Sequence, residues 1–137
     1  MGVYLSYRYQ PMTQDKTIEK LTVVIGASLN PWRFSHMCIL KLRSHNIPVI
    51  AIGLKAGTIG DVPIETGYPD IKNVHTVSLY IGAELQQNYY EYILKIKPKR
   101  IIFNPETYNP ELEYLANMND LHTVEACTML LIDAGLF

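Results

Sequence analysis

Residues 21–35 read Leu-Thr-Val-Val-Ile-Gly-Ala-Ser-Leu-Asn-Pro-Trp-Arg-Phe-Ser, and the fold is decided by this stretch. Its first five residues form a nearly continuous apolar run, rich in β-branched side chains, that ends at Gly26. Such a run is typical of a strand buried on both faces of a parallel sheet. Beyond the loop, apolar residues recur at spacings of three and four over residues 35–45, which predicts an amphipathic helix. A buried strand, a loop and a helix are therefore expected in that order.

The same alternation continues along the chain. Further strands are predicted at residues 48–52, 75–81, 100–103 and 122–124, and further helices at 83–97, from Asn109-Pro110 onward, and at 128–136. Asn109 followed by Pro110 is typical of a helix N-cap with proline at the first helical position. Residues 54–73 are rich in Gly, Pro and Asp, so we expect an irregular crossover there.

Five short strands alternating with helices predict a single α/β domain over residues 17–137. The expected architecture is three-layered and Rossmann-like, with a doubly wound parallel sheet of about five strands and right-handed crossovers. We expect the strand order 3-2-1-4-5. Residues 1–16 show no sustained hydrophobic period, so they are expected to be an N-terminal extension, either lying on the surface or disordered.

Composition excludes several classes of function. The 137 residues include 12 basic and 13 acidic side chains, so no basic excess favours binding to DNA or RNA. No apolar run approaches the roughly 20 residues that span a bilayer. Two cysteines and the lack of a secretory signal predict a cytoplasmic protein without a disulfide framework. No paired Cys-x-x-Cys or His-Glu-x-x-His motif occurs, so we expect no metal site.

The loop after the first strand is the main candidate site. A strand-to-helix junction offers an anion free backbone N–H groups and the positive end of the helix dipole. Glycine permits a tight turn, the serine hydroxyls can donate, and arginine can pair with a phosphate bidentately. The alternative is that these are ordinary turn residues beside a solvated arginine. The candidate ligand-binding residues of this loop are Gly26, Ala27, Ser28, Asn30, Arg33 and Ser35.

The end of the second strand narrows the choice of ligand. The loop lacks the G-x-G-x-x-G and Gly-Lys-Ser/Thr patterns, which disfavours ATP hydrolysis. NAD sites use an acidic side chain after the second strand, whereas this chain has Gly53 and Lys55 there. A lysine suits a second phosphate, which favours coenzyme A or NADP over NAD. Lys55 as a plain surface lysine is the alternative.

The fourth strand leads into Asn104-Pro-Glu-Thr107, which we expect to face the first loop if the strand order is 3-2-1-4-5. Asn104 and Thr107 are candidates for orienting a ligand, and Glu106 for an acid or base. The alternative is an ordinary turn followed by a helix cap. Ser28 lacks the following glycine of a nucleophile elbow, so a serine hydrolase is disfavoured.

Four separated segments resemble one family. They are Val24–Ser35, Thr76-Val-Ser-Leu-Tyr-Ile-Gly82, Phe103-Asn-Pro-Glu-Thr-Tyr-Asn-Pro-Glu-Leu112 and Val124-Glu-Ala-Cys-Thr128. Together they resemble the small stand-alone CoA-binding proteins, whose Rossmann-type domain is similar to the nucleotide-binding part of the succinyl-CoA synthetase α subunit. The resemblance covers about residues 18–137. It implies that the first loop holds a pyrophosphate and that Gly53–Lys55, with Tyr80 and Ile81, flanks an adenosine.

The sequence therefore predicts a domain that binds coenzyme A or a related phosphorylated nucleotide, in a non-catalytic or regulatory role. The absence of a defined acid, base or nucleophile favours this hypothesis over an enzyme. One alternative is an NADP-linked or CoA-dependent enzyme completed by a partner subunit, and another is an assembly protein that has lost its ligand. Tyrosine is favoured at interfaces, so Tyr89, Tyr90 and Tyr92 leave a homo-oligomer open.

Overall fold

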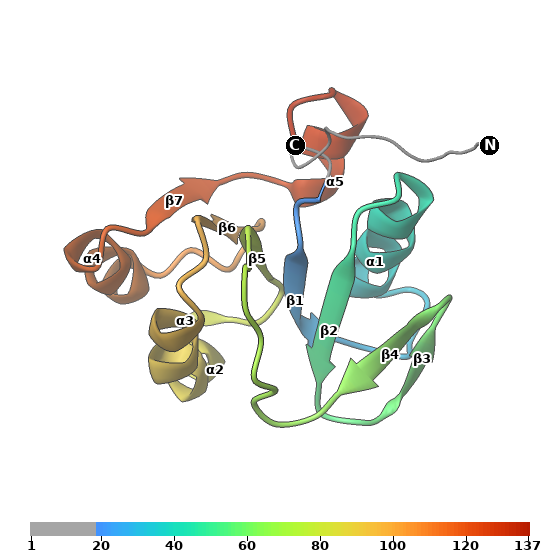
Figure 1. Cartoon of the computed structure of the whole chain (residues 1–137), viewed down its shortest axis with the longest axis horizontal. Coiled ribbons are helices and arrows are strands. Elements are labelled where there is room, and N and C mark those ends of the chain that lie inside the picture. Colours follow the sequence, from blue (N-terminus) through green and yellow to red (C-terminus); the bar gives the residue numbers. More distant parts are fainter. Residues whose placement is uncertain (1–18) are drawn as a thin grey trace.

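Residues 19–137 are described by the computed structural model, and the predicted extension at residues 1–16 lies outside them (Figure 1). Strands and helices alternate in the order β1 (Thr22–Ala27), α1 (Phe34–Ser44), β2 (Val49–Gly53), β3 (Gly57–Ile59), β4 (Val62–Glu65), β5 (Thr76–Leu79), α2 (Ala83–Gln86), η2 (Gln87–Tyr89), α3 (Tyr90–Ile96), β6 (Arg100–Phe103), α4 (Pro110–Met118), β7 (His122–Glu125) and α5 (Thr128–Asp133). The α/β class predicted from the sequence is confirmed.

The strands form one sheet in the order β3-β4-β2-β1-β5-β6-β7. All neighbours in it pair in parallel except β3 and β4. β1 lies inside the sheet, where Thr22 is in register with Val49 of β2 and with Thr76 of β5. Figure 1 shows α1 and α5 together on one side of the sheet and α2, α3 and α4 on the other. The predicted three-layer arrangement is therefore present.

The alternation of side chains along β1 supplies both halves of the core. Val23 and Ile25 pack in the cluster beneath α3 and α4, with Leu112. Val24 packs on the opposite face with Ile39 of α1. Each of these side chains is fully buried, and burying one contributes about 1.5–3 kcal/mol relative to leaving it exposed.

The segment predicted as an irregular crossover, residues 54–73, instead contains the β3–β4 hairpin, so the sheet has seven strands rather than about five. Gly60 adopts φ +59° in its two-residue turn, the conformation that tight hairpins favour at this position. Val62 and Ile64 are buried while Pro63 is exposed, which is the alternation of a strand. Proline usually argues against a strand, and this obscured β4 in the sequence.

The hairpin also changes how the strands are counted. With β4 as the third parallel strand, the parallel strands follow the order 3-2-1-4-5-6. The strand predicted at residues 75–81 is therefore the fourth and pairs with β1, not beyond β2. Asn104 follows β6, which β5 separates from β1, so the prediction that Asn104 directly faces the first loop is wrong. The strand order reverses between β1 and β5.

The helix predicted at 83–97 is divided into α2, the 3₁₀ turn η2 and α3. The division follows Gln86, whose fully buried side chain turns inward to accept and donate hydrogen bonds instead of remaining on a solvent face. Tyr92 of α3 is buried as well, which removes it from a subunit contact. Within residues 19–137, the helices lack the length and apolar character that crossing a bilayer requires.

Candidate functional site

The loops that follow β1, β2 and β5 meet at the carboxyl edge of the sheet, beside the point where strand order reverses. Ligands in open α/β sheets bind in the crevice at this position. Ala27 at the end of β1 is in register with Gly53 at the end of β2. On the other side of β1, the Tyr80 backbone N–H donates to the Ile25 carbonyl oxygen at 2.9 Å.

Two glycines permit this close approach. Gly26 has φ +103°, and a Cβ placed there would lie 2.9 Å from Ile81 Cγ2 and 3.1 Å from the Tyr80 carbonyl oxygen. A Cβ on Gly53 would lie 2.3 Å from the Ala27 carbonyl oxygen. The structure therefore gives Gly26 and Gly53 a packing role that brings the three loops together.

The loop between β1 and α1 is held by its own polar groups. Asn30 Oδ1 accepts from the Trp32 N–H at 3.0 Å, and the Asn30 carbonyl oxygen accepts from the Arg33 N–H at 3.1 Å. The Ser28 hydroxyl oxygen accepts from the Asn30 N–H at 3.1 Å. His36 Nδ1 donates to the Ser28 carbonyl oxygen at 2.8 Å. Four hydrogen bonds within one short segment define the path of its backbone.

The first turn of α1 faces the end of this loop. Arg33 is the N-cap, and its side chain makes no capping hydrogen bond to the first amides of the helix. No acidic residue lies in this first turn. Ser35 is buried, whereas Arg33 and Lys55 are exposed at the same edge of the sheet. The amides and the positive end of the helix dipole are thus combined with two exposed cationic side chains.

Tyr80 contributes its backbone to this edge and its side chain to the interior. Its hydroxyl is buried and has no hydrogen-bond partner within the described part of the chain. Burial raises the pKa of the Tyr80 phenol above its usual range. Burial also raises the pKa of the neighbouring Cys38 thiol to about 11. Burial therefore disfavours the ionised form of both groups.

Asn104 and Thr107 lie at the same edge with their side chains directed inward. Asn104 Nδ2 donates to Ser78 Oγ and to the Leu79 carbonyl oxygen, both at 2.8 Å, and Oδ1 accepts from the Thr128 N–H at 2.9 Å. Thr107 Oγ1 donates to the Asn104 carbonyl oxygen at 2.8 Å. These bonds join the ends of β5 and β6 to α5. That either side chain contacts a ligand stays a prediction.

Gln86 is an important residue that sequence reasoning missed. Its Nε2 donates to the carbonyl oxygens of Ile81, at 2.9 Å, and Thr107, at 2.7 Å. Its Oε1 accepts from Asn109 Nδ2 at 3.0 Å. The loops after β5 and β6 are therefore fastened to one amide. A polar residue on a predicted amphipathic helix gives no signal of such long-range partners, and the same holds for the contact between His36 and Ser28.

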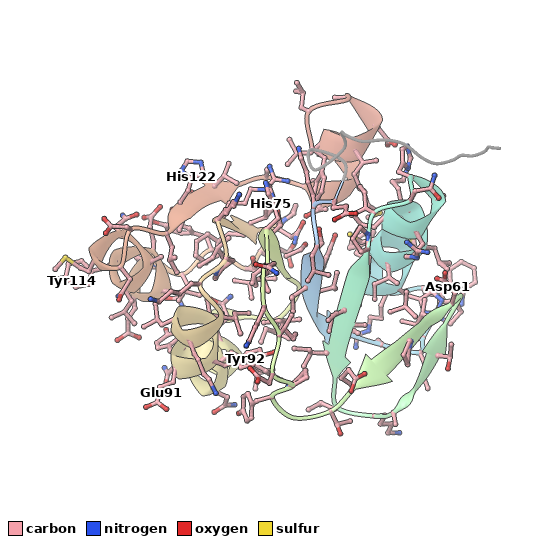
Figure 2. The ribbon with its side chains drawn as sticks, in the orientation of Figure 1. Asp61, His75, Glu91, Tyr92, Tyr114 and His122 are labelled. Carbon is pink, nitrogen blue, oxygen red and sulfur yellow. The ribbon has the colours of Figure 1, made fainter. Side chains whose placement is uncertain are left out.

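Other ionisable groups lie away from this edge. His75 and His122 sit at the amino ends of β5 and β7, where Figure 2 shows both at one edge of the sheet. Burial and the positive charge of Arg100 lower the pKa of His75 to about 4. Within residues 19–137, no group of three or more His, Cys, Asp or Glu residues is arranged to hold a metal ion.

The surface formed by residues 19–137 includes hollows at both edges of the sheet. One, of about 260 Å³, lies at the carboxyl ends of β6 and β7 and is lined in part by Asn104 and Cys127. The other, of about 520 Å³, is lined by Leu21, Arg43 and Pro48 among others and lies at the amino ends of β1 and β2. The smaller hollow is the better candidate for a ligand site, because it lies at the same carboxyl edge of the sheet as the loop after β1.

Comparison with known proteins shows the family and the fold of the chain. A family model described as CoA binding domain matches residues 20–133. The crystal structure of an uncharacterized protein is 39% identical, with a TM-score of 0.84 over 87% of this chain and 98% of that one. No curated protein matches this chain. The resemblance indicated by the four sequence segments is confirmed by the family match.

More distant structures share the fold. A hypothetical protein from Pyrococcus horikoshii OT3 is 22% identical, with a TM-score of 0.77 over 96% of this chain and 99% of that one. The dinucleotide-forming acetyl-coenzyme A synthetase 1 of Ca. Korarchaeum cryptofilum, determined with phosphate and ADP, is 15% identical, with a TM-score of 0.67. The match covers 81% of this chain and 26% of the synthetase, so the fold corresponds to about a quarter of that larger protein.

Proposed function

The chain belongs to the CoA-binding domain family, and from this premise we propose that it binds coenzyme A through the loop between β1 and α1, in a non-catalytic or regulatory role. The main support for this proposal is the position of the loop. It lies where the strand order reverses, and it delivers the uncapped first turn of an eleven-residue helix to the carboxyl edge of the sheet. The diphosphate would bind these amides, with Ser28 and Arg33 beside it.

The charges around the loop favour coenzyme A over NAD. Coenzyme A carries a ribose phosphate in addition to its diphosphate, and NAD does not. Arg33 and Lys55 supply one cationic side chain for each group. The segment after β2 reads Gly53-Leu54-Lys55, which offers no carboxylate to the ribose hydroxyls of NAD. NADP has the same two kinds of phosphate, so it is the alternative ligand.

The groups nearest the loop favour a non-catalytic role. Burial raises the pKa values of Tyr80 and Cys38 further above neutral pH, which disfavours their ionised forms. The amide of Asn104 and the hydroxyl of Thr107 donate their hydrogen bonds within the protein, where they join neighbouring loops. We assign these last two residues to holding the site in shape. An NADP-linked or CoA-dependent enzyme completed by a partner is the second candidate, favoured by the carboxylates of Glu106 and Glu125 around the nearby cavity.

Titration calorimetry with CoA, NADPH, NADH and ATP tests the proposal. CoA is expected to bind most tightly, and the Arg33→Ala variant is expected to bind it about tenfold or more weakly, because a charge-assisted hydrogen bond contributes about 1.5–3 kcal/mol. Lys95→Ala, which removes an exposed cation from α3, is the matched control and should leave the affinity unchanged. Equal CoA affinity in the Arg33 variant and the wild type would remove Arg33 from the site. Hydride transfer from NADPH would favour the enzyme instead.

A further inference from the structure

The hollow of about 260 Å³ at the carboxyl ends of β6 and β7, called the cavity below, is open to solvent and has an apolar part and a polar part. Phe103, Pro105 and Ala126 line it together with Tyr108, whose ring meets that of Phe103 edge-on with centroids 5.6 Å apart. The volume corresponds to that of about nine water molecules in the liquid. This volume is large enough for a short acyl chain.

The cavity lies at the distance that a bound CoA would span. Two strand spacings separate β1 from β6 and a third reaches β7, which is roughly 10–14 Å. The phosphopantetheine arm has about as many backbone bonds between phosphorus and sulfur as four extended residues, or roughly 14 Å. With the diphosphate at the loop after β1, the arm is therefore long enough to bring the sulfur, and any acyl group on it, to this cavity.

The charged groups around the cavity are all acidic. Glu106 and Glu125 line it with exposed carboxylates. The Tyr108 hydroxyl donates to Glu113 Oε1 at 2.6 Å, which holds a third carboxylate nearby. Among the described residues that line the cavity, none is Lys, Arg or His. A ligand carboxylate that enters the cavity would be repelled by these carboxylates, and no cation lining the cavity would offset the repulsion.

We propose that this cavity receives the acyl group of an acyl-CoA and selects uncharged acyl groups over those that end in a carboxylate. This inference rests on the proposed binding of CoA and adds the class of acyl group. Acetyl and butyryl groups meet the apolar part of the cavity, and a succinyl group brings its carboxylate between Glu106 and Glu125.

Binding of CoA, acetyl-CoA, butyryl-CoA and succinyl-CoA to the full chain tests this selectivity. Acetyl-CoA and butyryl-CoA are expected to bind at least as tightly as CoA. Succinyl-CoA is expected to bind about tenfold or more weakly than butyryl-CoA, which has a chain of equal carbon number. The difference should shrink at high ionic strength, because salt screens charges at a protein surface.

Removing the two charges provides the second arm of the experiment. In the double variant Glu106→Gln, Glu125→Gln, succinyl-CoA should bind within about threefold of butyryl-CoA, because the Coulomb repulsion is gone. Glu91→Gln is the matched control, since Glu91 is an exposed carboxylate on α3 and points away from the molecule in Figure 2. It should keep the wild-type preference. Thermal unfolding of each variant checks that the fold is intact.

The outcomes separate the two claims. Failure of every CoA ester and of CoA itself to bind would overturn the proposed function and this inference with it. Binding of CoA with equal or tighter binding of succinyl-CoA would overturn the inference alone. A preference for butyryl-CoA that persists undiminished in the double variant would also overturn it.

Discussion

Gly26 shows how one backbone position determines the shape of the site. Its φ of +103° lies in a region that other residues rarely adopt, and its missing side chain leaves room for Ile81 and for the backbone of Tyr80. The sequence predicts a turn at this glycine but gives no sign of the partner across the sheet. That partner depends on β5 lying beside β1, which only the assembled sheet reveals.

The substitution Gly26→Ala should destabilise the protein by about 2–4 kcal/mol, because strained backbone and a Cβ contact of 2.9 Å add together. Gly67→Ala is the matched control. Gly67 also has positive φ, +80°, but nothing lies within 4 Å of a Cβ placed there. It should cost only about 1 kcal/mol. Urea unfolding measures both, and equal losses would contradict the close packing of the two loops.

His75 makes stability depend on pH. Burial and the nearby cations Arg100, Lys20 and Lys99 lower its pKa from 6.5 to about 4. Between these values the unfolded chain binds a proton on this group that the folded protein does not, so its contribution is complete above pH 6.5 and is lost as the pH falls toward 4.

We expect the melting temperature of wild type to fall more steeply between pH 6.5 and 4 than that of His75→Gln. His122→Gln serves as the control, because it removes a histidine that is exposed at the start of β7. Thermal melts at intervals of pH measure the slopes. Parallel profiles for wild type and His75→Gln would show that His75 does not carry the dependence.

At the scale of elements, short sequence motifs predict those helices and turns that are stabilised by contacts between neighbouring residues. The Asn109-Pro110 pair predicts the start of α4, and Asn109 Oδ1 accepts from the N–H groups of Glu111 and Leu112 there. The β3–β4 hairpin was not predicted, although Gly60-Asp61 between short apolar runs is a turn signal of its own. Pro63 hides the strand that follows this turn, because a proline inside a short apolar run usually argues against a strand.

Asn109→Ala should cost about 2–3 kcal/mol, since the helix cap is lost and Gln86 Oε1 is left buried without Asn109 as its donor. The same change at Asn119, the exposed C-cap of the same helix, should cost less than about 0.5 kcal/mol. Guanidinium unfolding of the two variants provides the measurement. Similar small losses in both would mean that Asn109 contributes only as a surface residue.

At the scale of the whole molecule, the order of the strands determines which loops share an edge. Hydrophobic period predicts the buried strands and the loop carrying Arg33, because both follow from local pattern. The pairing of strands across the sheet does not follow from local pattern, so the expected position of Asn104 opposite the first loop was wrong. The fastening role of Gln86 was hidden for the same reason, since its partners lie 5, 21 and 23 residues away.

A crystal structure of the protein grown with coenzyme A tests the central claim most directly. We predict density for the diphosphate against the first amides of α1, with the Arg33 guanidinium beside it and the pantetheine sulfur toward the ends of β6 and β7. A diphosphate bound elsewhere on the protein, with the loop between β1 and α1 vacant at saturating CoA, would contradict the account.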